Sequence, residues 1–385
     1  MPRTPVRLSL HPLGDRLAPA AFAAAAAGGT LTVTQTAAAV GAVTILDNPA
    51  AGTVTVDDVG DANPAAVFST VGRPGLAVRL APTDTTAVTY TIATPRAGGV
   101  ALRLNNSSPR TLTLLGGAQI GGTLAVAGGD GGLSVSESGA ALHVAGNATF
   151  AGGSGPDALG LGVTGTSVGG TLTLTRFNTV STSAGDTVGG NLVFNAAGEA
   201  TANVLSLIDT EVVGGLTYTG GPRADSVLLQ GTTARVDRNV TVALGAQLGA
   251  EFSQVLEESG AGNVIGGTVR VTGGQLGTDG VTLNGTVDGA VSIDLGGGTN
   301  EVFVSGLFNG PSFGYTGGAG VDTVNYAPLD GSAHARYSAR LGAGSDVAGF
   351  GSPTANPSFA FIDFGAGADT FGGTLNFSGT FLNLP

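Results

Sequence analysis

Aspartates that close glycine-rich loops are the strongest candidates for chemistry in this chain. The loops read glycine, any residue, glycine, any residue, aspartate, and they end at Asp157, Asp322, Asp346 and Asp369. Carboxylates stacked with loop carbonyls would offer Ca²⁺ the hard oxygen ligands that it prefers. In the alternative interpretation, each aspartate caps its own tight turn by accepting hydrogen bonds from backbone amides. The sequence therefore predicts candidate calcium sites at these four residues and no other cofactor.

The spacing of the loops indicates a repeat. Asp322, Asp346 and Asp369 follow one another at nearly equal intervals, and Asn300 stands in the equivalent place one interval before Asp322. A constant interval in a glycine-rich chain is typical of a repeat architecture. The last three acids should therefore lie along one edge of the molecule, whereas Asp157 has no matching acid one interval away.

A second pattern places strands around these loops. Residues 120–126, 168–174, 188–194, 265–271 and 371–377 share one template, a β-branched or aromatic residue, two glycines and an alternating strand. Alternation of apolar residues with threonine predicts half-buried strands, with Leu172, Leu174, Leu192 and Phe194 pointing inward. Strand, loop, strand and turn together take about 20 to 24 residues, the size of one coil of a parallel β-solenoid. Helical periodicity is limited to 20–27 and 252–258.

The composition agrees with such a rod and excludes several other classes of protein. The chain has 385 residues, 68 glycines, no cysteine and a net charge of −12. The absence of cysteine excludes disulfides and thiolate metal sites. The negative charge disfavours nucleic acid as a partner, because phosphate recognition needs clustered basic residues. The longest apolar stretch, 17–27, is too short to span a bilayer.

Three segments follow from these patterns. Residues 1–27 have a basic start, an apolar middle and small residues, which suits a disordered export or targeting segment; a plain disordered tail is the alternative. Residues 28–118 should form a less regular N-terminal β segment with a hairpin and the first coils. Residues 119–385 should form the solenoid, an all-β parallel β-helix with coils of about 22 residues.

Two resemblances support this architecture. The loops at 152–159 and 317–324 resemble the nonapeptide repeat of haemolysin-type calcium-binding proteins. The run Leu13-Gly14-Asp15-Arg16-Leu17-Ala18-Pro19-Ala20 resembles the N-terminal signature of secreted planctomycete repeat proteins, with Gly14 where an acid is usual. These resemblances imply a right-handed, bacterial, secreted solenoid with calcium in its glycine and aspartate loops. The chain departs from the haemolysin-type pattern in having one motif per coil.

Signals for catalysis are weak by comparison. The string 165–169, which contains Ser167, fits a nucleophile elbow, but a strand rather than a helix follows it, so we interpret it as a turn. His143 and His334 are isolated and lack the spacing of metal ligands. His334, Arg336 and Arg340 lie near the Asp346 loop and could form a site for an acidic sugar. Such a site would be unusual in a chain without tryptophan or lysine.

The sequence thus favours a secreted or cell-surface structural or adhesive protein without catalytic activity. Its expected partners are components of the cell envelope or matrix, carbohydrate among them, and not nucleic acid. We expect no membrane span. The alternative function is that of a carbohydrate-active β-helix enzyme, a polysaccharide lyase or hydrolase, which would need converging acidic, basic and aromatic side chains in a long groove.

Overall fold

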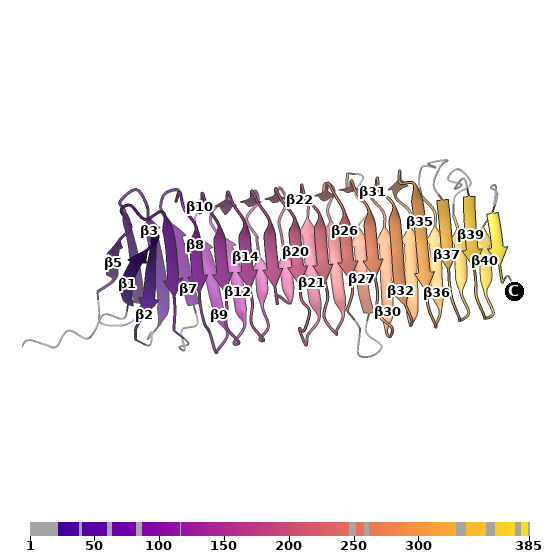
Figure 1. Cartoon of the computed structure of the whole chain (residues 1–385), viewed down its shortest axis with the longest axis horizontal. Coiled ribbons are helices and arrows are strands. Elements are labelled where there is room, and N and C mark those ends of the chain that lie inside the picture. The colour runs from indigo at the N-terminus through magenta and orange to yellow at the C-terminus, as the bar shows by residue number, and fades with distance from the viewer. Residues whose placement is uncertain are drawn as a thin grey trace, which may run out of the picture.

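The chain forms a rod of stacked β coils (Figure 1). The computed structural model describes residues 22–37, 41–59, 64–81, 87–115, 117–245, 252–257, 262–328, 336–351, 359–373 and 379–383. Within these ranges every regular element is a strand, β1 to β41, which confirms the predicted all-β solenoid. No helix long and apolar enough to cross a membrane occurs in the described ranges.

The strands form three sheets, of which A and B have sixteen strands each and C has nine strands in the middle part of the rod. Sheet A contains β1 (Phe22–Ala27), β2 (Thr30–Gln35), β6 (Gly75–Arg79), β8 (Val100–Arg103), β11 (Leu124–Ala127), β14 (Ala148–Ala151), β17 (Leu172–Thr175), β20 (Leu192–Asn195), β23 (Leu216–Thr219), β26 (Val240–Ala243), β29 (Val269–Thr272), β32 (Val291–Gly296), β35 (Ser312–Gly317), β37 (Arg336–Arg340), β39 (Phe359–Asp363) and β41 (Gly379–Leu382). Sheet B contains β3 (Ala42–Asn48), β4 (Thr53–Val59), β5 (Ala66–Ser69), β7 (Ala87–Ile92), β9 (Arg110–Leu115), β12 (Leu133–Ser138), β15 (Ala158–Gly160), β18 (Thr179–Ser181), β21 (Asn203–Ile208), β24 (Asp225–Gln230), β27 (Phe252–Glu257), β30 (Thr278–Leu283), β33 (Thr299–Val304), β36 (Asp322–Tyr326), β38 (Val347–Phe350) and β40 (Thr370–Gly373). Sheet C contains β10 (Gln119–Ile120), β13 (His143–Val144), β16 (Ser167–Val168), β19 (Thr187–Val188), β22 (Glu211–Val212), β25 (Arg235–Val236), β28 (Val264–Ile265), β31 (Thr286–Val287) and β34 (Leu307–Phe308).

The parallel register sets the length of a coil. Leu124 lies beside Ala148, and Ala148 beside Leu172, so these coils take 24 residues, slightly more than predicted. Other coils differ, since the pairing of Leu172 with Leu192 makes a shorter coil and that of Val240 with Val269 a longer one. Equivalent strand positions still face each other, so the connections between strands absorb the variation in length.

The repeated glycine template corresponds to the corner between sheets C and A. In four of its five copies a two-residue sheet C strand ends at the β-branched residue, and a sheet A strand begins after the two glycines. A Cβ atom at Gly122 would lie 2.6 Å from the amide nitrogen of Gly99, which is closer than packed atoms allow. The fifth copy does not fit this pattern, because Phe371 lies in β40 of sheet B, and residues 374–377 lie outside the described ranges.

The interior is filled by rows of like side chains from successive coils. Leu172, Leu174, Leu192 and Phe194 are fully buried, which confirms their predicted inward orientation. The Phe194 ring stacks on that of Tyr218 in the next coil, with 5.0 Å between the ring centroids. Such ladders make each coil depend on its neighbours for burial of its apolar surface.

The N-terminal end differs from the rest of the rod. There β1 pairs antiparallel with β2, and β3, β4 and β5 form an antiparallel meander. The helical expectation for 20–27 is wrong from Phe22 onward, because pairing with β2 overrides the helical preference of alanine. The same override makes Phe252–Glu257 a strand. Residues 1–21 of the predicted export segment lie outside the described ranges. Sheet A is continuous from β2 to β11, so the coils begin well before residue 119.

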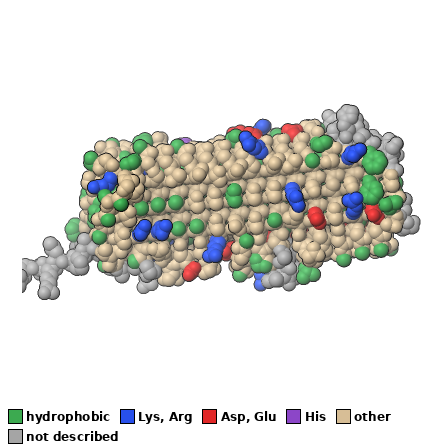
Figure 2. All heavy atoms as spheres, viewed as in Figure 1, with side chains coloured by type: hydrophobic (Ala, Val, Ile, Leu, Met, Phe, Trp, Pro, Cys, Tyr) green, Lys and Arg blue, Asp and Glu red, His purple; other side chains and the backbone are tan. Residues whose placement is uncertain are grey.

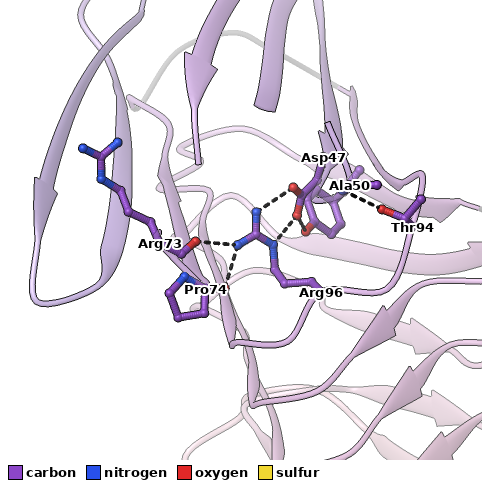
Figure 3. A network of polar contacts seen from close by, with 7 residues as sticks. Asp47, Ala50, Arg73, Pro74, Thr94 and Arg96 are labelled. Carbon is purple, nitrogen blue, oxygen red and sulfur yellow. Dashed lines mark hydrogen bonds and ion pairs between the residues drawn. The ribbon is translucent and has the colours of Figure 1, made fainter. Parts of the chain in front are cut away.

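A buried ion pair joins this N-terminal end to the coils (Figure 3). Arg96 donates two hydrogen bonds to Asp47, from Nε at 2.5 Å and from Nη2 at 2.6 Å, and its Nη1 donates to the carbonyl of Pro74 at 2.7 Å. The Tyr90 hydroxyl donates to the same carboxylate at 3.0 Å. Burial opposes the charge on Arg96, but the hydrogen bonds and charge of Asp47 outweigh it, so the pKa of Arg96 is raised.

Candidate functional site

A continuous row of polar side chains lies at the N-terminal ends of the sheet B strands, one from each successive coil. We call it the polar ladder, and it consists of Asp157, Asn178, Asn203, Asp225, Ser253, Asp279, Asn300, Asp322, Asp346 and Asp369. Every member is at most 7% exposed. The predicted residues Asp322, Asp346 and Asp369 do occupy consecutive coils. Asp157 belongs to the same ladder. Its neighbour in the next coil is an amide, Asn178, and not an acid, which is why the spacing of aspartates alone left Asp157 isolated.

The carboxylates of the ladder accept hydrogen bonds from backbone amides of their own loops or of a neighbouring coil. Asp157 accepts a hydrogen bond from the amide of Gly153 at 2.9 Å and another from the amide of Leu133, one coil away, at 2.5 Å. Asp346 accepts from the amide of Asp322 at 2.8 Å, and Asp369 accepts from the amide of Asp346 at 2.9 Å. Asp157 therefore caps its own turn, as the alternative interpretation predicts, and also links two coils. The hydrogen bonds of Asp346 and Asp369 link neighbouring coils.

The capping geometry accounts for the glycines of the motif. A Cβ atom on Gly152 would collide with the Asp157 carboxylate, and one on Gly317 would collide with that of Asp322. At Gly153 and Gly320 a Cβ would collide with a carbonyl oxygen of the preceding coil. The glycine pattern therefore follows from close packing between a buried carboxylate and stacked backbones.

Burial also changes the acidity of the ladder. It raises the pKa of Asp157 and of Asp322 to about 6, against the lowering effect of their hydrogen bonds. It raises the pKa of Asp346 as well, with a further contribution from the charge of Asp369. One oxygen each of Asp322 and Asp346, both named Oδ2, has no hydrogen-bond partner.

The ladder is a poor match for calcium. Calcium takes six to eight oxygen ligands, whereas Asp346 and Asp369 each direct one carboxylate oxygen to a backbone amide, which is a donor. The described residues contain no group of three or more histidine, cysteine or acidic side chains that could hold a metal ion. Calcium at Asp157, Asp322, Asp346 and Asp369 stays a prediction, and the hydrogen bonds favour the capping role.

A second candidate site is a groove that runs along the outer face of sheet C. It has a volume of about 750 Å³ and extends from Pro95 to Val213. Five polar side chains project along it, one from each of five successive coils: Gln119, His143, Ser167, Thr187 and Glu211. The opposite row holds small residues, Gly121, Ala145, Gly169 and Gly189, which leave the space open.

Within this groove His143 and Ser167 are in contact. The His143 Nδ1 and Ser167 Oγ atoms are 2.7 Å apart, from adjacent strands β13 and β16. Ser167 is therefore in a strand, and our interpretation of 165–169 as a turn is wrong at this residue. The amides of Gly169 and Gly170, which follow Ser167, donate to the carbonyls of Val144 and Gly146. These two amides are therefore not free to stabilise an oxyanion, whereas acyl transfer needs free donors of this kind.

The predicted acidic-sugar site is not assembled among the described residues. Arg340 lies over the ring of Phe361, 5.3 Å from its centroid, and Arg336 is exposed at the start of β37. The Asp346 carboxylate is buried in the ladder. His334 lies outside the described ranges.

Sequence reasoning placed Asn300 in the row but missed the whole groove and five members of the ladder: Asn178, Asn203, Asp225, Ser253 and Asp279. One signal for the groove was present, because Gln119, Ser167 and Thr187 each precede the β-branched residue of the glycine template. No protein-family model, curated protein or solved structure that was compared with the chain matches it. The geometry of the chain itself is therefore the basis for assigning a function.

Proposed function

We propose that the protein is a secreted or cell-surface structural and adhesive solenoid that contacts carbohydrate or other components of the envelope or matrix. The observation that carries this proposal is the outer face of sheet A. From β11 to β26 its strands contain no charged residue, and their outward positions hold mostly threonine and alanine. On the face shown in Figure 2, charged side chains are few and scattered.

A face of this kind suits many weak contacts with a repetitive partner. Equivalent side chains recur about every 4.8 Å along the rod, the distance between neighbouring strands. Thr149, Thr173, Thr217 and Thr241 offer hydroxyl groups at equivalent positions of this face. Individually weak contacts become strong when a rigid body presents them together.

Cosedimentation tests this adhesive role. Purified protein is incubated with insoluble cellulose, chitin and isolated bacterial cell wall, and the bound fraction is measured after centrifugation. We expect salt-resistant binding to at least one of them, since few charges are involved. Recovery of all the protein in the supernatant with each of the three materials would refute adhesion to carbohydrate.

The enzyme alternative has one specific observation in its favour, the contact between His143 and Ser167. A hydrolase that used this pair would release reducing ends or acyl groups from polysaccharide, and Ser167→Ala would abolish the release. The amides of Ser167, Gly169 and Gly170 already donate to carbonyls of the preceding coil, which leads us to expect no such release.

Calcium binding is tested separately by thermal melting. The capping geometry predicts the same Tm with millimolar calcium and with a chelator. A rise in Tm with calcium that disappears in Asp346→Asn would instead establish a metal site in the ladder.

A further inference from the structure

We propose that the groove on sheet C binds one chain of a linear, uncharged glycan, lying parallel to the axis of the rod. This inference rests on the proposed adhesive function and names a ligand and a site for it. The groove crosses six coils, from Pro95 in one coil to Val213 in the last. Five steps of about 4.8 Å give it a length of about 24 Å, enough for several sugar units.

The polar side chains of the groove match the repeat of such a ligand. Gln119, His143, Ser167, Thr187 and Glu211 are in register, so one hydrogen-bonding group is presented per coil. This spacing is close to the length of one sugar unit in an extended glycan. Amide, imidazole and hydroxyl groups both donate and accept hydrogen bonds, as sugar hydroxyls do.

The opposite side of the groove admits a chain that lies flat. Gly121, Gly169 and Gly189 have no side chain, and Ala145 has only a methyl group. A Cβ on Gly121 would lie 2.8 Å from the carbonyl oxygen of Ala97, so the stacking of the coils favours glycine at this position, and the row ends at the larger Val213. The exposed side chains of Pro95, Ala97 and Val213 give the groove apolar surface, which suits the carbon faces of sugar rings.

The charges of the groove favour a neutral ligand. Arg96 at one end is only 2% exposed and its guanidinium is bonded to Asp47. Glu211 at the other end lies beside Arg235 of the next coil, where its charge contributes to the raised pKa of that arginine. Among the described residues that line the groove, the one arginine, Arg96, is already paired with Asp47, so a polymer of uronic acids would lack a free arginine as its partner there. A neutral glycan needs no such partner.

An extended peptide fits this surface less well. Peptides that bind β proteins as strands pair with a free sheet edge. The groove lies over β10 to β22 of sheet C, where the amides of His143, Ala145 and Gly169 already donate to carbonyls of the preceding coil, and β10 itself is bridged to Arg96. Binding must therefore use the side chains, which favours a ligand rich in hydroxyl groups.

The test uses the full chain and soluble cellohexaose, chitohexaose and laminarihexaose as probes in isothermal titration calorimetry. Ala145→Trp fills the groove at a position that already carries a Cβ and is exposed. Ser134→Trp is the matched control, because Ser134 is also exposed but lies on β12 of sheet B, away from the groove and from the face of sheet A. We expect at least one probe to bind the native protein and Ser134→Trp equally. Ala145→Trp should bind it at least about tenfold more weakly, and Ser167→Ala several-fold more weakly.

Several results would overturn the inference. Equal affinity of native protein and a folded Ala145→Trp would exclude the groove, as would the absence of binding to all three probes. If Ala145→Trp does not fold, amide chemical shifts of the native protein decide: changes at Gln119, Ser167 and Thr187 support the groove, and changes confined to sheet A refute it. The two proposals can fail separately. If Ala145→Trp binds the hexaose as tightly as the native protein and also cosediments with polysaccharide, the groove is refuted but the adhesive function is retained.

Discussion

Removal of the Asp47 carboxylate should destabilise the N-terminal end of the rod more than any surface change. In Asp47→Ala the Arg96 guanidinium would keep its bond to the Pro74 carbonyl but lose both bonds to Asp47, while remaining 2% exposed. Tyr90 would lose its acceptor as well. Breaking a buried ion pair by removing one partner costs about 3 to 5 kcal/mol, because the other charge stays buried without compensation.

The assay has to resolve this end of the rod from the rest. Stacked coils unfold in part independently of one another. A single unfolding midpoint for the whole rod would therefore underestimate the loss of stability that Asp47→Ala causes at the N-terminal end. We therefore suggest hydrogen exchange of the β3 and β7 amides, with urea unfolding followed by circular dichroism as a second measurement. The free energy of opening β3 should fall by about 4 kcal/mol, or by the whole local stability if that is smaller.

Two controls make the result interpretable. Asp237→Ala breaks the ion pair between Arg235 and Asp237, whose side chains are 48% and 27% exposed, and should cost less than about 1 kcal/mol. The double variant Asp47→Ala with Arg96→Met removes both buried charges and should recover much of the stability. A cost for Asp47→Ala no larger than that of Asp237→Ala would refute the reasoning, since it would mean that water reaches the buried pair.

Three further predictions concern the coils themselves. Leu172→Asp should cost about 4 kcal/mol or more in urea unfolding and Thr173→Ala less than about 0.5 kcal/mol, and similar costs would mean that the inward face is misassigned. Gly152→Ala should cost about 1 to 3 kcal/mol because its Cβ would collide with the carbonyl oxygen of Arg176 and with the Asp157 carboxylate. Gly162→Ala, with open space around it, should be neutral, and a neutral Gly152→Ala would contradict the packing account. Burial raises the pKa of Glu257 to about 8, so the folded state holds this proton more tightly than the unfolded chain; the stability it contributes is complete below the unfolded pKa and is lost as the pH rises through about 8. Tm should accordingly fall between pH 5 and pH 9, and Glu257→Gln should fall less, while parallel pH profiles would exclude Glu257 as the cause.

The features predicted correctly from the sequence are those that recur at a fixed interval. The inward rows at Leu172 and Phe194 follow from alternation within a strand, and the alignment of Asp322 with Asp346 follows from equal spacing. Both are local or periodic patterns, which a single chain records directly.

What escaped prediction depends on contacts between coils of unequal length. Asn178 and Ser253 continue the ladder, but their spacing from neighbouring members varies and their side chains differ from aspartate. Sheet C strands are two residues long, too short to produce an alternating pattern, so the groove over them is invisible until the coils are stacked. The strand at Phe22–Ala27 depends on a partner that propensity does not include.

The parallel stacking of coils has a mechanical consequence. Backbone hydrogen bonds between coils lie along the axis of the rod, so tension applied to its two ends loads these bonds directly and can detach one coil at a time. A coil contributes about 4.8 Å to the rod but about 80 Å once pulled straight, so each rupture releases a long slack segment. A protein built in this way can lengthen many-fold under load while the coils that remain keep their surfaces intact.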